Sequence, residues 1–188
     1  MTGGGGPRCD GPVETGAVLE VLAALGDQGC PAWVGGGWGV DALVGHQTRP
    51  HRDVDLAMDA RGERATLDAL GRLGYQVQTD WRPVRVELGR PGIGWVDLHP
   101  VIFDDTGHGR QHDLDDGWFD YPAGCLTIGH LDGHPIPCLS IDQQIRFHTG
   151  YPPRDVDRHD LALLQHLRAC QRRSPSTRPG RPTRVTSG

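Results

Sequence analysis

The stretch WVGGGWGVDALVGHQTRPHRDVDL, residues 33–56, decides the fold expected for this chain. An apolar segment leads into a glycine-rich turn, and Asp53 and Asp55 then alternate with apolar residues. Because side chains alternate along a strand, Val54 and Leu56 facing a core would place both carboxylates on the opposite face. Paired carboxylates predict a site for Mg²⁺ or Mn²⁺, and the glycine turn predicts backbone N–H groups that hold phosphate. The expected ligand is a nucleoside triphosphate.

A third carboxylate occurs in the same kind of setting. Asp97 lies in Trp95-Val96-Asp97-Leu98, so it too is expected on the polar face of a strand with apolar neighbours. Phosphoryl and nucleotidyl transfer generally use two metal ions, or one metal ion and a base, beside the attacking oxygen. We therefore take Asp53, Asp55 and Asp97 as candidate catalytic residues and metal ligands. The alternative for Asp97 is a buried ion pair with an arginine such as Arg85.

The periodicities around this stretch predict an α+β (α/β) fold with a mixed β-sheet flanked by helices and with C-terminal helices. Helices are expected at 13–26, 38–44, 63–73, 140–148 and 155–169. Strands are expected at 32–34, 53–58, 75–79, 84–88 and 95–103, with a hairpin over 125–139. The acidic, glycine-containing segment 104–120 is expected to form a long loop.

The composition predicts one domain over residues 13–170, with a helical part from about 140 to 170, between a glycine-rich tail at 1–12 and an arginine-rich tail at 171–188. The formal charge of -5 argues against a nucleic-acid partner, whose binding domain would normally be basic. Five scattered cysteines without a CxxC pair indicate neither a disulfide framework nor a thiolate zinc site. No apolar run is long enough to span a bilayer, so no membrane partner and a cytoplasmic location are expected.

The motifs resemble antibiotic nucleotidyltransferases of the polymerase-β superfamily. The resemblance rests on GGGWGVD at 35–41, TRPHRDVDL at 48–56, residues 81–88, DLHP at 97–100, PCLS at 137–140, FHTGY at 147–151 and DRHD at 157–160. It is greatest to the small lincosamide nucleotidyltransferases, while the aminoglycoside 2''-nucleotidyltransferases look like more distant relatives. The similarity runs from about residue 33 to residue 164 and so covers most of the chain.

The resemblance implies a nucleotidyltransferase fold and a Mg²⁺-dependent reaction, with two ions expected and ATP as co-substrate. AMP, or another nucleoside monophosphate, would pass to a hydroxyl of a small-molecule antibiotic and pyrophosphate would leave. A lincosamide is the favoured acceptor, and an aminoglycoside is the alternative. Asp97 would take the acceptor proton, or would orient that hydroxyl and share the second metal ion.

The remaining candidate site residues fall into two groups. The nucleotide-binding candidates are Gly35, Gly36, Arg49 and His51, in the glycine turn and the segment before Asp53. The acceptor-binding candidates are Trp81, Arg85, Glu87, His148 and Tyr151. Arg85 and Glu87 share strand parity, so both are expected to face the pocket. His148 and Tyr151 lie near a helix end, where they would stack on the base or on the antibiotic.

Two readings from other classes stay open. In one, His51, Asp53, Asp55, Asp97 and His99 bind a transition metal in a phosphoesterase, because imidazole and carboxylate together suit Mn, Fe or Zn. In the other, the chain is an antitoxin-type nucleotidyltransferase that acts on a protein. The sequence also leaves open whether the protein is a monomer or a homodimer.

Overall fold

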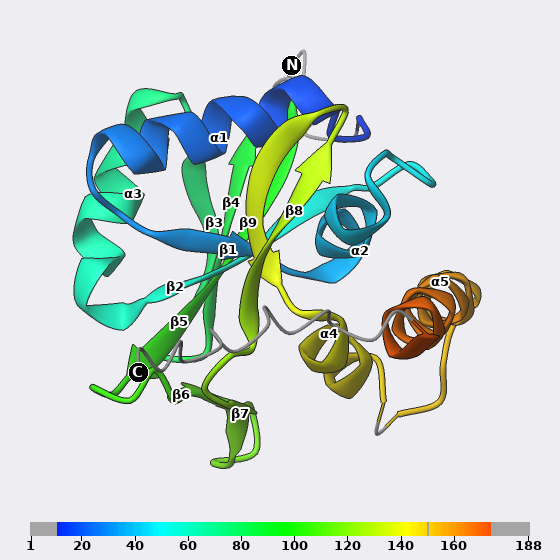
Figure 1. The fold of residues 1–188 in the computed structure, drawn as a ribbon. Coiled ribbons are helices and arrows are strands. Elements are labelled where there is room, and N and C mark those ends of the chain that lie inside the picture. The colour runs from blue at the N-terminus through cyan, green and yellow to red at the C-terminus, as the bar shows by residue number, and fades with distance from the viewer. Residues whose placement is uncertain (1–10, 150, 174–188) are drawn as a thin grey trace, which may run out of the picture.

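The computed structural model describes residues 11–149 and 151–173 (Figure 1). Its helices are α1 (Thr15–Asp27), α2 (Gly36–Val44), the 3-10 turn η1 (Ala60–Gly62), α3 (Glu63–Arg72), α4 (Ile141–Phe147) and α5 (Asp155–Arg173). Its strands are β1 (Ala32–Val34), β2 (Asp53–Asp59), β3 (Gln76–Trp81), β4 (Arg85–Arg90), β5 (Gly94–Phe103), β6 (Gly109–His112), β7 (Trp118–Tyr121), β8 (Leu126–Leu131) and β9 (His134–Leu139). The α+β fold predicted from the sequence is confirmed.

The strands form a mixed sheet in the order β3-β4-β5-β2-β1-β9-β8, with the β6–β7 hairpin extending from the end of β5 (Figure 1). The central pair, β2 and β5, is parallel and places Asp55 directly opposite Asp97. β4 runs antiparallel to β5 and places Glu87 opposite Asp97 from the other side. Three strands therefore bring acidic residues to one point of the sheet.

One face of these central strands is apolar and covered. Helices α1 and α3 lie against each other and contribute residues such as Val21 and Leu70 to the main core. The sheet contributes the alternate residues of β2, β4 and β5, namely Val54, Leu56, Met58, Val86, Leu88, Val96 and Leu98. All of these sheet residues are at most 1% exposed, so the residues between them are turned to the other face.

Helix α2 begins earlier than the sequence predicts. Its start was expected at Trp38, but the helix begins at Gly36 with Gly35 as the N-cap residue. The glycine turn is therefore the first turn of the helix rather than a separate loop. The helix ends as expected at Gly45, whose positive φ of 106° suits a residue without a side chain.

The expectation of a long loop at 104–120 was wrong. Residues 109–112 and 118–121 pair as the hairpin β6–β7. This hairpin is held by tertiary contacts that an acidic, glycine-containing sequence does not reveal. The ring of Tyr121 packs edge-on against Phe103 of β5 and Phe147 of α4. The hydroxyl of Tyr121 donates to Gln111 Oε1 at 2.7 Å.

The C-terminal helix is longer than predicted. It was expected to end near Ala169, with a tail from 171, but α5 continues to Arg173. The rest of that expected tail, and residues 1–10 of the expected N-terminal tail, lie outside the described residues. In the described part of the chain, no helix combines the length and the apolar character needed to cross a bilayer.

Candidate active site

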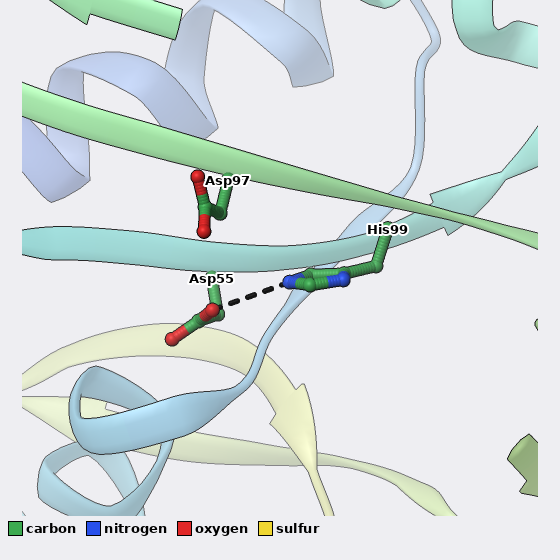
Figure 2. A group of neighbouring side chains, drawn as sticks. All are labelled: Asp55, Asp97 and His99. Atoms are coloured by element: carbon green, nitrogen blue, oxygen red, sulfur yellow. Dashed lines mark hydrogen bonds and ion pairs between the residues drawn. The ribbon is translucent and has the colours of Figure 1, made fainter. Parts of the chain in front are cut away.

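The centre of the site is the pair of carboxylates on the parallel strands β2 and β5. Side-chain atoms of Asp55, Asp97 and His99 lie within 4.8 Å of one another, and Figure 2 shows the three side chains converging from the two strands. Asp97 is almost fully buried, and its Oδ1 atom has no hydrogen-bond partner in the described structure. Because a buried polar atom without a partner is costly, this oxygen is a candidate ligand atom for a cation.

The other oxygen of Asp97 is held by an arginine. Arg85 donates to Asp97 Oδ2 at 3.1 Å and also contacts Glu87 Oε1 at 3.1 Å. The guanidinium lies 4.4 Å from the centre of the Trp81 ring, whose side chain is about half exposed. The ion pair between Arg85 and Asp97, which the sequence offered as an alternative to function, is thus present, but it uses only one oxygen of the carboxylate.

His99 follows Asp97 by two residues and therefore faces the same side of β5. Its Nε2 atom lies 3.2 Å from Asp55 Oδ1, the contact drawn as a dashed line in Figure 2. Its Nδ1 atom lies 3.1 Å from the amide nitrogen of Gln111 on β6. The hairpin that the sequence did not predict therefore supports the site directly.

Asp53 lies on the same face of β2 as Asp55 but at the edge of the group. Its carboxylate accepts two hydrogen bonds from Arg52, at 3.0 and 3.2 Å. The close cluster is made of Asp55, Asp97 and His99 and does not include Asp53. Of the three acids taken as metal ligands from the sequence, Asp55 and Asp97 are the two that the structure brings into this cluster.

The charges of the cluster shift its acid–base properties. Burial raises the pKa of Asp97 to about 6, and the nearby Asp55 carboxylate raises it as well. Burial and the charge of Asp55 also raise the pKa of Asp53. Burial would raise the pKa of Asp55 too, but the hydrogen bond from His99 and the charge of Arg85 hold it below its ordinary value. Asp55 is therefore the most easily ionised of the three.

The first turn of α2 closes over Asp55. The Gly35 N–H donates to the main-chain carbonyl oxygen of Asp55 at 2.8 Å. Gly36 has a φ of +51°, and a Cβ atom placed there would lie 1.9 Å from Asp55 Oδ2. A Cβ atom on Gly37 would lie 2.4 Å from the His51 ring. Only residues without side chains allow the helix N-terminus to approach the carboxylate so closely.

Arg49 and His148, assigned to nucleotide and acceptor binding respectively, meet at one residue of α5. Asp160 accepts from Arg49 Nε at 3.0 Å, and His148 Nε2 lies 3.5 Å from the same carboxylate. Burial alone would lower the pKa of His148, but Asp160 and the Gln144 carbonyl raise it. These contacts tie the segment before β2 to the C-terminal helices.

His51 and Tyr151 are placed differently from each other. His51 is buried, with Nε2 2.5 Å from Asp41 Oδ2 and its ring against Trp38. The His51 ring therefore packs against helix α2 and lies next to Gly37 in its first turn. Tyr151 is 44% exposed and lies just before α5. Neither belongs to the cluster around Asp55.

The family described as aminoglycoside-2''-adenylyltransferase matches residues 17–164, a range that contains all the site residues described above. The chain belongs to this family. As a member of this family, the protein is a nucleotidyltransferase. The resemblance of its motifs to antibiotic nucleotidyltransferases is therefore confirmed.

Two kinds of relative match this family member over different lengths. A lincosamide resistance protein of Staphylococcus haemolyticus is 33% identical over 135 residues, which cover 72% of this chain and 84% of that protein. A 2''-aminoglycoside nucleotidyltransferase of Klebsiella pneumoniae is 44% identical over 57 residues, which cover 29% of this chain and 32% of that protein. The lincosamide likeness thus extends over far more of the chain.

Solved structures give the same fold. A crystal structure of the lincosamide antibiotic adenylyltransferase LnuA with bound lincomycin has a TM-score of 0.76 and 30% identity, covering 83% of this chain and 99% of that one. A solution structure of the resistance factor ANT(2'')-Ia has a TM-score of 0.61 and 23% identity, covering 83% and 89%. The nucleotidyltransferase fold expected from the motifs is therefore confirmed.

The sequence analysis did not predict the role of several residues of this site. His99 appeared within the DLHP motif and as a metal ligand in the phosphoesterase reading, but not among the transferase site residues, although its parity with Asp97 places it on the same face. Gln111 was not singled out, and Asp160 appeared only within the DRHD motif at 157–160, because each acts through partners far away in the chain. Gln144, whose side chain donates to the Gly36 carbonyl at 3.2 Å, was missed for the same reason.

Proposed function

We propose that the protein transfers AMP from ATP, in the presence of Mg²⁺, to a hydroxyl of an antibiotic and releases pyrophosphate. One observation carries the proposal. Asp55 and Asp97 lie opposite each other on parallel strands, and the buried Oδ1 atom of Asp97 has no partner. A lincosamide is the first acceptor to consider, because the lincosamide relatives match most of the chain. An aminoglycoside is the second, because the family description and the shorter matches name that class.

The residues present suit a hard divalent cation. Carboxylate oxygens are the ligands that Mg²⁺ prefers. Asp55 and Asp97 each offer one such oxygen within the close cluster, and Asp53 adds another carboxylate at the edge of the site. Such an ion, held by these residues, would neutralise charge on the triphosphate and make the acceptor hydroxyl more acidic. The partnerless oxygen of Asp97 is the structural feature that fits this ion best.

The start of α2 supplies the phosphate side of the proposed site. The N–H groups of a helix's first turn have no partners within the helix and attract anions. Gly36 carries no side chain, so the Asp55 carboxylate lies against the start of the helix, and a cation held by Asp55 would bring phosphate oxygens close to those N–H groups. Arg49, held by Asp160, lies beside the same turn and adds positive charge.

Asp97 is the proposed proton acceptor. A base works best when its pKa lies near the working pH, and burial raises the pKa of Asp97 to about 6. Its Oδ2 atom is fixed by Arg85, so Oδ1 is the oxygen that would either receive the proton of the acceptor hydroxyl or hold the metal ion that makes this hydroxyl more acidic. Glu87 and Trp81 flank Arg85 and form the wall of the proposed acceptor site.

The test is pyrophosphate release from ATP and Mg²⁺ with a panel of lincosamides and aminoglycosides. Wild-type protein is compared with Asp55→Asn, Asp97→Asn and the control Asp59→Asn. Asp59 lies at the far end of the same face of β2, where it pairs with Arg61 outside the cluster. We expect a product heavier by AMP with one acceptor class, loss of activity in the first two variants and retention in the control. Folded wild-type protein that turns over no acceptor would contradict the proposal.

A further inference from the structure

His99 lies at the end of a chain of hydrogen bonds that begins on β7. The Tyr121 hydroxyl donates to Gln111 Oε1 at 2.7 Å. Gln111 Nε2 lies 3.3 Å from the Val84 carbonyl oxygen and 3.1 Å from His99 Nδ1. His99 Nε2 in turn lies 3.2 Å from Asp55 Oδ1. Tyr121 and Gln111 are buried, so little water competes for these bonds.

The Val84 carbonyl determines the direction of the chain. A carbonyl oxygen only accepts, so the Gln111 atom that faces it is the amide nitrogen. The amide oxygen then faces Tyr121 and accepts its hydroxyl proton. The same amide nitrogen faces His99 Nδ1, so Nδ1 accepts and carries no proton. The imidazole proton is therefore on Nε2, the nitrogen next to Asp55.

A histidine that binds a metal ion has the opposite arrangement. Its ligating nitrogen has a free lone pair, and its other nitrogen donates to a carboxylate or a carbonyl. Here the nitrogen beside the carboxylates carries the proton, and the distant nitrogen faces a donor. The closeness of Asp55, Asp97 and His99 therefore does not amount to a site with three metal ligands.

We propose that His99 is a positioning residue, which donates from Nε2 to Asp55 Oδ1 and is held in that tautomer by Gln111. This inference deepens the proposed function and rests on it for the identity of the bound ion. With Oδ1 occupied by His99, the free oxygen of Asp55 is Oδ2, the atom that faces Gly36. Asp55 Oδ2 and Asp97 Oδ1 are then the oxygen atoms that would hold a metal ion, without the nitrogen ligand that the phosphoesterase reading requires.

The tautomer is measured first, on the metal-free wild-type protein labelled with ¹⁵N-histidine. Two-dimensional ¹H–¹⁵N correlation of the His99 ring shows which nitrogen carries the proton. We expect the proton on Nε2 in the wild type and on Nδ1 in Gln111→Glu, whose carboxylate accepts where the amide donated. The control His112→Gln, changed next to Gln111 on β6, should leave the His99 signals in place. A proton on Nδ1 of wild-type His99 would overturn the proposal.

Metal binding is measured second, by pulsed EPR of the same labelled protein loaded with Mn²⁺. We expect no directly bound ¹⁵N, and we expect His99→Gln to bind Mn²⁺ as the wild type does. A bound-nitrogen signal that disappears in His99→Gln would identify His99 as a ligand and overturn the proposal.

Two substitutions separate a donor from a ligand by activity. His99→Gln keeps an N–H donor, whereas His99→Glu removes the donor and adds an oxygen ligand of the kind Mg²⁺ prefers. We expect a loss in turnover of about tenfold for Gln and at least about 100-fold for Glu. The reverse order would overturn the proposal. The NMR and EPR measurements contain no nucleotide or acceptor, so a failure to find any acceptor would refute the proposed function while these two still decide the role of His99.

Discussion

The two faces of β2, β4 and β5 differ completely although they are made of alternating residues of the same strands. One face, with residues such as Leu56 and Leu98, is closed off by α1 and α3. The other face, with Asp55 and Asp97, has acids, an arginine and a histidine within contact of one another. We infer from the difference that strand parity divides stability from chemistry. On these strands, a substitution at an even-numbered position should affect stability, and one at an odd-numbered position should affect activity.

The largest effect is expected on the polar face. Asp55→Asn should lower turnover about 1,000-fold, because Asp55 is a proposed metal ligand and removal of such a charge costs several kcal/mol of transition-state stabilisation. Its free energy of unfolding should change by less than about 1 kcal/mol, since the main-chain bond to Gly35 remains. Steady-state kinetics and urea unfolding of the same preparation measure both quantities. A large loss of stability would show that the two faces are not separable.

The neighbouring position should give the opposite result. Leu56→Ala removes a fully buried side chain from the main core and should lower the free energy of unfolding by about 3 kcal/mol. Turnover per folded molecule should stay within a few-fold of the wild type, measured well below the unfolding midpoint. If Leu56→Ala loses turnover as Asp55→Asn does while still folded, parity does not divide the two properties.

A matched pair of glycines tests how close the helix must come to the polar face. Gly36→Ala places a Cβ atom against Asp55 Oδ2 and should lower turnover about 100-fold through misplacement of that carboxylate. Gly16→Ala lies within α1 with open space around it. It should raise the free energy of unfolding by about 0.5 to 1 kcal/mol and leave turnover unchanged. Equal turnover in the two variants would contradict the close approach.

The smallest effect expected for a residue of the polar face is the pH dependence of the free energy of unfolding. Burial raises the pKa of Asp97 to about 6, above the value near 3.9 expected in the unfolded chain. Between these values the native state binds more protons than the unfolded state, so the wild type loses stability as the pH rises from about 4 to about 6. Asp97→Asn cannot titrate there.

Urea unfolding without metal ions, at pH 4.5 and at pH 8, measures this dependence. The stability of Asp97→Asn relative to the wild type should improve by about 2 kcal/mol over that interval. Asp59→Asn is the control, because the Arg61 hydrogen bond lowers the pKa of Asp59 instead of raising it. An unchanged difference between Asp97→Asn and the wild type would show that Asp97 titrates normally.

Much of the polar face could be predicted from the sequence, because it depends on period-two alternation. Asp53, Asp55 and Asp97 were each placed on a strand in alternation with apolar residues, and the strands are there. Alternation says which face a residue occupies, but it does not say which strand lies beside it. The contact of His99 with Asp55 depends on the β2–β5 register, and that register is a tertiary property.

The features that the sequence does not reveal depend on partners far away in the chain. Arg49 was taken as a nucleotide-binding candidate from its position before β2, which gives no sign of its pairing with Asp160, 111 residues later. The β6–β7 hairpin was read as a loop because its sequence has no apolar alternation, whereas packing of Tyr121 against Phe103 and Phe147 holds it. Local patterns contain no information about such contacts.

The bond between the Gly35 N–H and the Asp55 carbonyl has an evolutionary consequence. It joins the glycine turn to the strand through main-chain atoms alone, so it uses no atom of the side chain at position 55. A single substitution there would remove the chemistry and leave the turn assembled. A single mutation could therefore produce a folded but inactive descendant of such an enzyme. A homologue with an intact glycine turn should be examined at position 55 before it is counted as a source of resistance.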